Sequence, residues 1–371
     1  MFFLIIITSL FSLYAVLIIY YWLSWKSIPE YLYTISEPKI KISIIIPARN
    51  EEKNIGNLLQ ALKNQTYPSS LFEVIVVDDH SNDSTAAIVQ QFNFAKLIQL
   101  NEENINSYKK KAIEKGIAAA TGNLIVTTDA DCNPSINWLQ TIAAFKQENQ
   151  SSFIAAPVVF TNNNSLLQVF QSLDFLVLQG ITGASVYKNI HSMCNGANLA
   201  YERQVFYDVN GFSGIDTIAS GDDMLLMHKI WKKFPDKVHY LKSKDAIVST
   251  EPMLTWKSFF NQRIRWASKA KSYDDKRIMG VLLLVYLFNL SFLVLLIAGC
   301  WYPYYFIYIF SLWIAKTIIE LPFVYSVAKF FDKQSLIKYF FFFQPLHISY
   351  TIVSGLFGQF GKYEWKGRTV R

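Results

Sequence analysis

The sequence predicts an α/β domain with a mostly parallel sheet, joined to membrane-spanning helices near both ends of the chain. Short apolar runs alternate with helical stretches between about residues 40 and 250. Continuous apolar strands of this kind are buried on both faces, as in parallel sheets covered by helices. Acidic or other polar residues follow three of the runs directly. Because ligands of such sheets bind beyond the carboxyl ends of the strands, these residues predict a functional site.

The composition is too apolar for an ordinary soluble protein. Of the 371 residues, 52% are hydrophobic and 16% are aromatic, and the net charge is +7. Together these values indicate one sizeable domain with membrane spans. The basic balance fits an anionic inner leaflet and a phosphate ligand better than nucleic acid, so no nucleic-acid partner is expected. Three scattered cysteines and five dispersed histidines predict neither a zinc site nor a disulfide framework.

Residues 1–26 are predicted to form an amino-terminal transmembrane anchor. Residues 2–25 carry no charge, and roughly 20 apolar residues are enough to cross a bilayer. A cleaved signal peptide is the alternative, but the run lacks a basic start and a small-residue cleavage site. Since the first charge is Lys26, the following domain is expected in the cytoplasm, on the inner membrane of a bacterium.

Four strands are expected within residues 40–254, the range predicted for the α/β domain. They lie at Ile42–Ile46, Val74–Val77, Leu97–Leu100 and Leu124–Thr128. Helices are expected near Ile55–Leu62 and from about Lys109 to Ala120. The polar segments that follow the strands and would face one crevice are Pro47–Glu51, Asp78-Asp79 and Asp129-Ala130-Asp131.

Residues 278–361 are predicted to be a carboxyl-terminal region with two to three spans. Residues 278–315 carry no charge, which is too long for one span, and Pro303 marks a turn between two. The second span is expected over about residues 304–328. A third run, residues 339–361, is also long enough to span.

That third run is predicted to be a re-entrant hairpin, and the alternative is a complete span that breaks the positive-inside preference. Gln344, Pro345 and His347 interrupt it. A complete span would also place the basic tail, residues 362–371, outside, against the preference for positive charge in the cytoplasm.

Lys316 and Glu320 stand out within the second span. They are four residues apart and would share one helix face. Charges inside a membrane are expensive and are usually paired or functional. The pair therefore predicts either a structural ion pair between helices or a contact with an acceptor head group.

Five segments resemble, in the same order, the motifs of the family 2 glycosyltransferases. They are I-P-A-R-N-E-E at 46–52, V-V-D-D-H-S-N-D-S-T at 76–85, T-D-A-D at 128–131, G-D-D at 221–223 and Q-R-I-R-W at 262–266. The match covers roughly residues 40–270. The resemblance implies a Rossmann-like GT-A fold, a nucleotide-sugar donor, Mg²⁺ or Mn²⁺ as cofactor, and inversion at the anomeric carbon. The tail around Trp365 also resembles that of lipid glucosyltransferases related to ceramide glucosyltransferase.

Asp131 and Asp129 are the metal ligands that the resemblance implies. Asp131 is the first choice for direct contact, with Asp129 reaching the metal through water or holding the ribose. A metal would offset the charge developing on the departing phosphate oxygen. The alternative is that these acids cap a helix beginning at Asn133-Pro134-Ser135.

The donor's nucleoside is expected to lie against the first two motifs. Asp79 resembles the family residue that recognises the uracil ring, and Asp78 would replace it if the register differs by one. In the family, the turn that here holds Pro47, Arg49 and Glu51 also lines this pocket.

Lys109 stands where the family often has a lysine near the diphosphate. Lys110 and Lys111 follow it directly and make that assignment ambiguous. The alternative is that all three lysines form a solvated basic face.

Asp223 aligns with the second acid of the family's Glu-Asp motif, which makes it the expected general base. A carboxylate on the acceptor side can take the proton of the attacking hydroxyl. Asp222 stands where glutamate is more common, so the choice between the two aspartates is open. A helix cap for residues 224–231 is the alternative. Gly196-Ala197-Asn198 resembles the segment that forms the floor of the acceptor site.

The motif Gln262-Arg263-Ile264-Arg265-Trp266 lies on a helix expected from about Thr255 to Ser272, within an interfacial segment at 255–275. Its apolar and basic residues recur at helical spacing, which suits a membrane surface. In the family this motif closes over the donor. The resemblance implies Arg265 near the diphosphate and Trp266 near the acceptor sugar, with Gln262 and Arg263 beside them. An interfacial anchor is the alternative.

The predicted function is transfer of a sugar from a nucleotide-sugar, with UDP expected, to a hydroxyl of a membrane lipid at the cytoplasmic face. The first alternative is a processive polysaccharide synthase of the poly-N-acetylglucosamine or hyaluronan type. Such an enzyme needs helices lining a wet path, and three or four spans are few for this. The second alternative is a non-catalytic membrane scaffold with the same fold.

Overall fold

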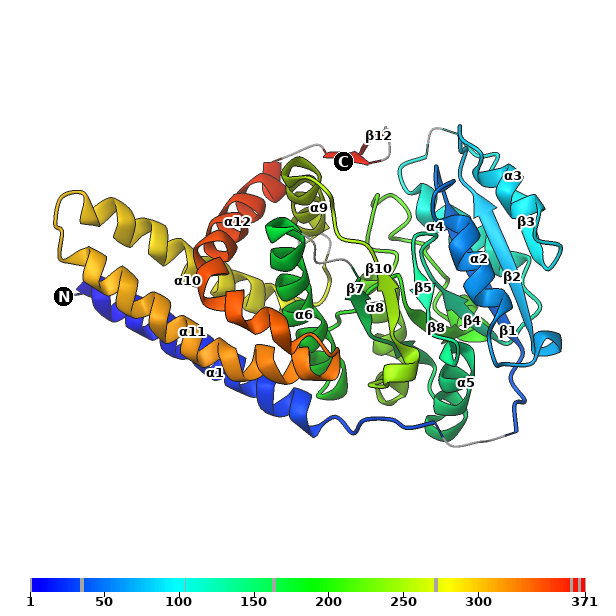
Figure 1. Cartoon of the computed structure of the whole chain (residues 1–371), viewed down its shortest axis with the longest axis horizontal. Coiled ribbons are helices and arrows are strands. Elements are labelled where there is room, and N and C mark those ends of the chain that lie inside the picture. Colours follow the sequence, from blue (N-terminus) through cyan, green and yellow to red (C-terminus); the bar gives the residue numbers. More distant parts are fainter. Residues whose placement is uncertain are drawn as a thin grey trace. The chain divides into compact units, whose positions relative to one another are not determined.

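The chain forms two compact units in a computed structural model that describes residues 2–33, 37–103, 105–161, 165–269, 273–360, 363–365 and 368–370 (Figure 1). The α/β unit comprises residues 29–161, 192–251 and 364–371. The helical unit comprises residues 1–28, 162–191 and 252–363. Residues 162–191 thus group with the helical unit, although they lie inside the range expected for the α/β domain.

The α/β unit is built on a seven-stranded sheet with the order β3-β2-β1-β4-β8-β6-β9. Only β8 runs antiparallel to its neighbours, so the predicted mostly parallel sheet is confirmed. Its strands are β1 (Ile42–Ala48), β2 (Phe72–Asp78), β3 (Ala95–Gln99), β4 (Leu124–Thr127), β6 (Phe153–Ala155), β8 (Leu199–Glu202) and β9 (Val238–Tyr240). A smaller sheet joins β5 (Asn133–Pro134), β10 (Val248–Thr250) and β7 (Val158–Phe160).

Helices cover this sheet through apolar faces at helical spacing. The first of them, α2, buries Ile55, Leu58, Leu59 and Leu62, which recur every three to four residues. The helices are α2 (Ile55–Lys63), α3 (Thr85–Gln90), α4 (Tyr108–Ala118), α5 (Trp138–Asn149), α7 (Arg203–Asp208) and α8 (Met224–Lys233). Short 3-10 turns lie at Ser69–Leu71, Pro235–Lys237 and Lys244–Ala246. Because β1, β2 and β4 are adjacent and parallel, their carboxyl ends meet at one edge.

The helical unit packs around one buried helix. Its helices are α1 (Phe2–Ser27), α6 (Leu166–Tyr187), α9 (Trp256–Ser268), α10 (Lys276–Gly299), α11 (Tyr305–Phe330) and α12 (Phe340–Phe360), with a 3-10 turn at Gln334–Tyr339. Five of them are long and apolar enough to cross a membrane, and α6 is one of these. The apolar window of α6 is 83% buried, against 22–28% in the other four. The structure therefore makes α6 the core of this unit, with α1 running alongside the α10–α11 hairpin (Figure 1).

The predicted re-entrant hairpin is wrong, because residues 340–360 form the single helix α12. Pro345 lies inside it, and a proline leaves the carbonyl four residues earlier without its usual donor. Here the indole N–H of Trp313 donates to the carbonyl of Phe341 at 3.2 Å, and the two rings stack 4.6 Å apart. This replacement donor explains how the helix continues through the proline. The run was expected to end at Gly361, which lies outside the described residues. The described residues of the basic tail form β11 (Tyr363–Trp365) and β12 (Arg368–Val370).

Lys316 and Glu320 form a buried network between helices. The Lys316 Nζ atom lies 2.6 Å from Glu320 Oε1 and 2.6 Å from Gln344 Oε1. Glu320 also accepts hydrogen bonds from the Tyr14 hydroxyl and from the Gln344 amide. Since each charge is satisfied within the unit, this geometry agrees with the predicted structural ion pair.

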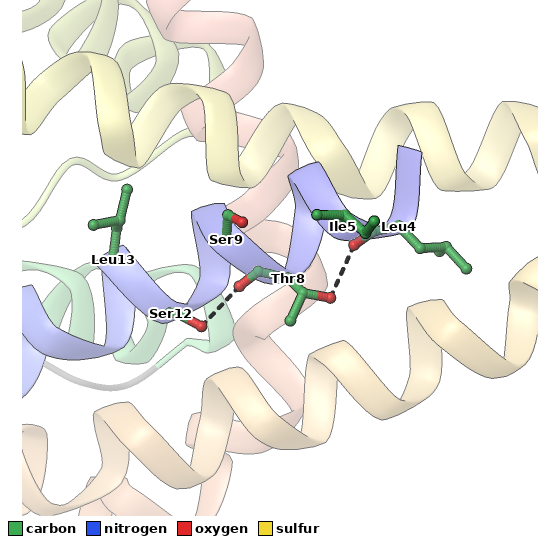
Figure 2. A pocket seen from close by; sticks show the side chains of 6 residues that line it. All are labelled: Leu4, Ile5, Thr8, Ser9, Ser12 and Leu13. Carbon is green, nitrogen blue, oxygen red and sulfur yellow. Dashed lines mark hydrogen bonds between the residues drawn. The ribbon is translucent and has the colours of Figure 1, made fainter. Parts of the chain in front are cut away.

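A shallow hollow along α1 has no charged side chain among the residues that line it. Leu4, Ile5, Thr8, Ser9, Ser12 and Leu13 line it (Figure 2). The Thr8 hydroxyl donates to the carbonyl of Leu4 at 2.8 Å, and the Ser12 hydroxyl donates to that of Thr8 at 2.9 Å. These bonds satisfy the two hydroxyls within the helix, as a lipid-facing surface requires.

Gly180→Ala is expected to destabilise the helical unit by about 1–3 kcal/mol, because it overpacks a close helix contact. A Cβ atom at Gly180 would lie 2.5 Å from the Val327 side chain and 2.7 Å from the Phe323 ring. The matched control is Gly280→Ala in α10, where a Cβ meets nothing within 4 Å. That variant is expected to gain about 0.5–1 kcal/mol, because alanine is a better helix former. Thermal unfolding in detergent measures the melting temperature of both variants. Equal shifts in melting temperature would contradict the close packing of α6 against α11.

Candidate active site

Carboxylates from separate elements of the α/β unit converge on the ammonium group of Lys109. Lys109 lies in the first turn of α4, Asp129 follows β4, and Asp222 precedes α8. The Lys109 Nζ atom lies 2.6 Å from Asp129 Oδ1 and 3.3 Å from Asp222 Oδ2. Burial lowers the pKa of this ammonium, but the nearby charges of Asp129 and Asp222 outweigh burial and raise the pKa above its ordinary value. The lysine therefore stays charged and links the two carboxylates.

Gly196 closes this cluster from the loop before β8. Its backbone N–H donates to Asp223 Oδ2 at 3.2 Å. A Cβ atom at this position would lie 3.2 Å from Asp222 Oδ2 and 3.3 Å from Lys109 Nζ. A side chain at this position would therefore have to push the lysine and Asp222 side chains aside by a few tenths of an ångström.

Asp223 has two roles in the geometry. It is the N-cap of α8, and its Oδ1 atom accepts a hydrogen bond from the Met224 backbone N–H at 2.7 Å. The cap that the sequence offered as an alternative is therefore present, and the same residue also belongs to the acidic cluster. Asp222 is paired with an ammonium group, whereas Asp223 accepts from backbone N–H groups.

The alternative helix cap for Asp129 and Asp131 is wrong. Asn133 and Pro134 form β5, which pairs with β10, and α5 begins only at Trp138. The two acids lie at the end of a strand, as the metal hypothesis requires. Beside them, burial and the nearby charges of Asp131 and Asp129 raise the pKa of the Cys132 thiol well above its ordinary value.

Within the described part of the chain, no group of three His, Cys, Asp or Glu side chains could hold a metal ion by itself. A cation at this edge would need further oxygen ligands. Mg²⁺ is commonly held in this way, by one or two carboxylates together with substrate phosphates. The oxygen-only donors Asp129 and Asp131 fit Mg²⁺ or Mn²⁺ on those terms.

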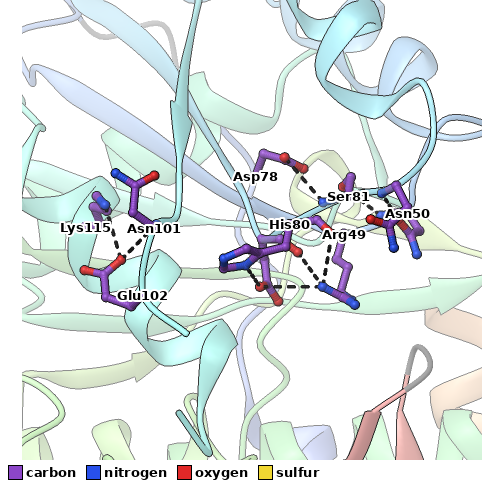
Figure 3. Close-up of polar contacts among 10 residues, drawn as sticks. Arg49, Asn50, Asp78, His80, Ser81, Asn101, Glu102 and Lys115 are labelled. Atoms are coloured by element: carbon purple, nitrogen blue, oxygen red, sulfur yellow. Dashed lines mark hydrogen bonds and ion pairs between the residues drawn. The ribbon is translucent and has the colours of Figure 1, made fainter. Parts of the chain in front are cut away.

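A second polar cluster joins the ends of β1 and β2 (Figure 3). The Arg49 guanidinium donates to the carbonyls of Asp79 at 2.8 Å and His80 at 3.2 Å, and lies 3.8 Å from Asp79 Oδ1. His80 Nδ1 lies 3.0 Å from the same carboxylate oxygen. His80 was missed by the sequence analysis, although it stands inside the second motif.

The other residues expected near the nucleoside surround this cluster. Asp78 Oδ2 accepts from the Ser81 backbone N–H at 3.4 Å, while its Oδ1 atom is buried without a hydrogen-bond partner among the described residues (Figure 3). The Glu51 backbone N–H donates to the Thr85 hydroxyl at 2.7 Å. Pro47 lies in β1 beside Val77 of β2. The first two motifs therefore lie together at the edge of the sheet, as predicted.

The three consecutive lysines of α4 have three different environments. Lys109 reaches the acids, and Lys110 is buried and donates to backbone carbonyls of residues 215–220. Lys111 pairs at the surface with Glu114 at 2.9 Å. The alternative of one solvated basic face is therefore wrong, because the helix turns each side chain toward a different neighbour.

Asn198 belongs to the segment expected to form the floor of the acceptor site, and that role stays a prediction. Its side chain is fully buried, and its amide donates to the carbonyls of Pro157 and Ala246 at 2.8 Å each. Its Oδ1 atom accepts from the Trp138 indole at 3.0 Å. These bonds use both amide donors in joining parts of the α/β unit.

The Gln262–Trp266 motif lies on α9 in the helical unit, and the predicted helix end at Ser272 lies outside the described residues. Arg263 is 4% exposed and pairs with Asp174 of α6 at 2.6 Å. Its guanidinium also lies 4.3 Å from the Trp266 ring centre. Gln262 Oε1 accepts from Arg263 at 3.1 Å. The roles of Gln262, Arg263, Arg265 and Trp266 at the donor or acceptor stay predictions.

Comparison with known proteins shows that the sequence is similar to one protein family. The sequence model described as "Glycosyl transferase family 2" matches residues 43–209. The probable glycosyltransferase YdaM of Bacillus subtilis (strain 168) is 28% identical over 250 residues, which is 65% of this chain and 58% of that protein. The glycosyltransferase AglE of Haloferax volcanii is 30% identical over 187 residues, which is 49% of this chain and 58% of that protein. The matches thus span 58% of the length of each of these two relatives.

A solved structure shares the fold over nearly the whole chain. It is the mannosyltransferase PcManGT from Pyrobaculum calidifontis in complex with GDP-Man and Mn²⁺. The TM-score is 0.58 at 17% identity, and the alignment covers 96% of this chain and 98% of that one. The GT-A fold that the sequence resemblance implied is confirmed by this likeness and by the sheet described above, and the helices long and apolar enough to cross a membrane are compatible with the predicted membrane anchoring.

Proposed function

We propose that this chain, whose residues 43–209 form a glycosyl transferase family 2 domain, moves a sugar from a nucleotide-sugar to a hydroxyl of a membrane lipid. One observation carries the proposal. Lys109 joins Asp129, at the end of a central strand, to Asp222, which stands beside Asp223. Residues suited to a diphosphate and residues suited to an attacking hydroxyl thus meet at one place.

On the donor side, Asp131 and Asp129 would hold Mg²⁺ or Mn²⁺, and the ion would offset the charge that develops on the leaving diphosphate. Lys109 would contact the diphosphate itself as a cation. Asp79 or Asp78, with the turn that carries Pro47, Arg49 and Glu51, would hold the nucleoside. The buried, unpaired Oδ1 atom of Asp78 supports a ligand donor at that point, because such acceptors are normally satisfied.

On the acceptor side, Asp223 would accept the proton of the hydroxyl as that oxygen attacks the anomeric carbon. Its two backbone N–H donors fix the orientation of its carboxylate. Asp222 is the alternative base, and its Oδ2 atom lies 3.3 Å from the ammonium group of Lys109.

A lipid is the proposed acceptor because the helical unit presents an apolar exterior. The four candidate spans outside its core bury only 22–28% of their apolar windows. The α/β unit would work at the cytoplasmic face of a bacterial inner membrane, following the charge pattern around Lys26. UDP is the proposed nucleotide. The mannosyltransferase with the same fold is described with GDP-Man, so both nucleotides belong in a donor screen.

The donor screen incubates the purified chain in detergent with radiolabelled UDP-sugars and GDP-sugars, Mn²⁺ and a bacterial lipid extract. A labelled lipid of low mass is the expected product. A long labelled polymer would contradict the lipid acceptor and favour a processive synthase. If no donor is turned over, the proposal that this chain is a glycosyltransferase is wrong.

Asp131→Asn is expected to abolish Mn²⁺-dependent UDP binding without unfolding the protein. The loss should reach at least about 100-fold in affinity, because even residues behind a metal ligand contribute 10- to 100-fold. Isothermal titration calorimetry with UDP, with and without Mn²⁺, measures this before any acceptor is known. Asp208→Asn is the matched control, since Asp208 is exposed at the end of α7 and loses the same charge. Unchanged Mn²⁺-dependent binding in Asp131→Asn would contradict the assigned ligand.

A further inference from the structure

Lys110 is a buried cation that the donor and acceptor assignments above do not use. It lies in the first turn of α4 and is only 2% exposed. Its Nζ atom donates to the carbonyl oxygens of Ile215 at 2.8 Å, Ser220 at 2.9 Å and Ile218. Three carbonyls of one short segment therefore share one ammonium group.

The same segment is fastened by two more side chains. The Ser107 hydroxyl, at the N-cap of α4, donates to the carbonyl of Asp216. From α8, the Lys229 Nζ atom donates to the carbonyls of Gly211 at 2.6 Å and Ser213 at 2.8 Å. Residues 211–220, named here the fastened segment, are thus held by side chains along their length rather than by a sheet ladder.

The fastened segment leads directly into the acidic pair of the active site. Gly221 alone separates Ser220 from Asp222 and Asp223. The residue before Lys110 is Lys109, which contacts Asp129 and Asp222. The first turn of α4 therefore contacts both Asp129 and Asp222, through Lys109, and the segment that precedes Asp222 and Asp223, through Lys110.

A structural reason alone does not explain an ammonium group at this position. Burying a charge is costly even when hydrogen bonds compensate it, and an apolar side chain of similar length would fill the same volume. Lys110 makes three hydrogen bonds to carbonyls of a segment that is far from α4 in the sequence. These bonds specify one conformation of that segment. Preorganised acids and bases need such fixed supports, because small misplacements reduce catalysis strongly.

We propose that Lys110 is a positioning residue, which fixes the fastened segment so that Asp222 and Asp223 stand opposite Asp129. The inference rests on the proposed function for its consequence in catalysis. Its structural part, the anchoring of residues 211–220 by Lys110, does not depend on any activity.

The test compares Lys110→Met with Lys111→Met, which loses the same charge from the neighbouring position. Lys111 pairs with Glu114 on the surface, where the side chains are 41% and 45% exposed. Hydrogen exchange followed by mass spectrometry reads the fastened segment directly. We expect faster exchange over residues 211–221 in Lys110→Met and unchanged exchange in Lys111→Met. Equal exchange in both variants and the wild type would overturn the proposal.

Kinetics separate positioning from general loss of structure. Lys110→Met should lower kcat on the order of 100-fold, as for a misplacement of about 1 Å, while Mn²⁺-dependent UDP binding stays unchanged. Lys110→Arg, which keeps a cation, should restore part of kcat. Equal loss of UDP binding and kcat would indicate a merely structural role and overturn the proposal.

Two controls keep the result interpretable. If Lys110→Met does not fold, Ser107→Ala removes one smaller contact to the same segment and should also speed its exchange. Unchanged exchange in Ser107→Ala would then count against the anchoring. If the wild type transfers no sugar, the proposed function fails, whereas the exchange measurement still decides the anchoring by Lys110.

Discussion

Asp223→Asn is expected to lower kcat for sugar transfer by about 10²–10⁴-fold, the usual contribution of a general base. The acceptor hydroxyl must lose its proton as it attacks, and an asparagine amide cannot accept that proton. Asparagine keeps the size of the side chain. It is also as good an N-cap as aspartate, so α8 and the bond from Met224 should persist. Mn²⁺-dependent UDP binding and the melting temperature should therefore stay close to wild type.

Asp222→Asn is the matched comparison, because the two residues are adjacent and the substitution is identical. Asp222 contacts Lys109 at 3.3 Å, and Lys109 also holds Asp129 at 2.6 Å. Removing its charge should weaken donor binding more than Asp223→Asn does and should lower kcat less. The reverse order of kcat values would assign the base to Asp222. Full activity in both variants would remove both from the mechanism.

Arg263→Met is expected to destabilise the helical unit by about 3–5 kcal/mol, because it leaves a buried carboxylate without its counter-ion. Arg263 and Asp174 side chains are each 3% exposed and lie 2.6 Å apart. The Tyr350 hydroxyl also donates to Asp174, which ties α9, α6 and α12 together. The guanidinium lies over the rings of Phe259 at 4.9 Å and Trp266 at 4.3 Å, so the variant loses these contacts as well. Unfolding by denaturant in detergent micelles measures the loss.

Two further variants show whether the loss comes from burial of an unpaired charge. The double variant Arg263→Met with Asp174→Leu removes both charges and should recover a large part of the lost stability. Lys111→Met breaks an exposed pair and should cost less than about 1 kcal/mol. A double variant no more stable than Arg263→Met would contradict this explanation.

Much of the α/β unit could be predicted because local pattern and tertiary structure agree there. The runs at Ile42–Ile46 and Val74–Val77 became β1 and β2, since continuous apolar residues suit strands covered on both faces. The later strands β6, β8 and β9 have only three to four residues each, which gives too little pattern to recognise. Helix α6 was not predicted from the sequence, because its position in the chain does not show where it packs. It lies in the middle of the α/β sequence but packs in the helical unit.

The sequence misled where a residue's partner lies far away in the chain. Pro345 suggested a break, but the Trp313 side chain from α11 supplies the missing donor. Asn198 lies in a segment expected to form the floor of the acceptor site, yet its amide donates to the carbonyls of Pro157 and Ala246. Neither partner can be read from residues nearby in sequence.

Local sequence pattern was enough to predict the fold class, the strands that precede Asp79 and Asp129, and the apolar segments of the membrane region. These follow from local periodicity and from polar residues at strand ends. Sequence pattern could not show which of the three adjacent lysines reaches the acids. Successive residues on a helix point about 100° apart, so the neighbour that each lysine meets depends on how α4 packs against the rest of the unit. That packing directs Lys109 to Asp129 and Asp222, and Lys110 to the segment before them.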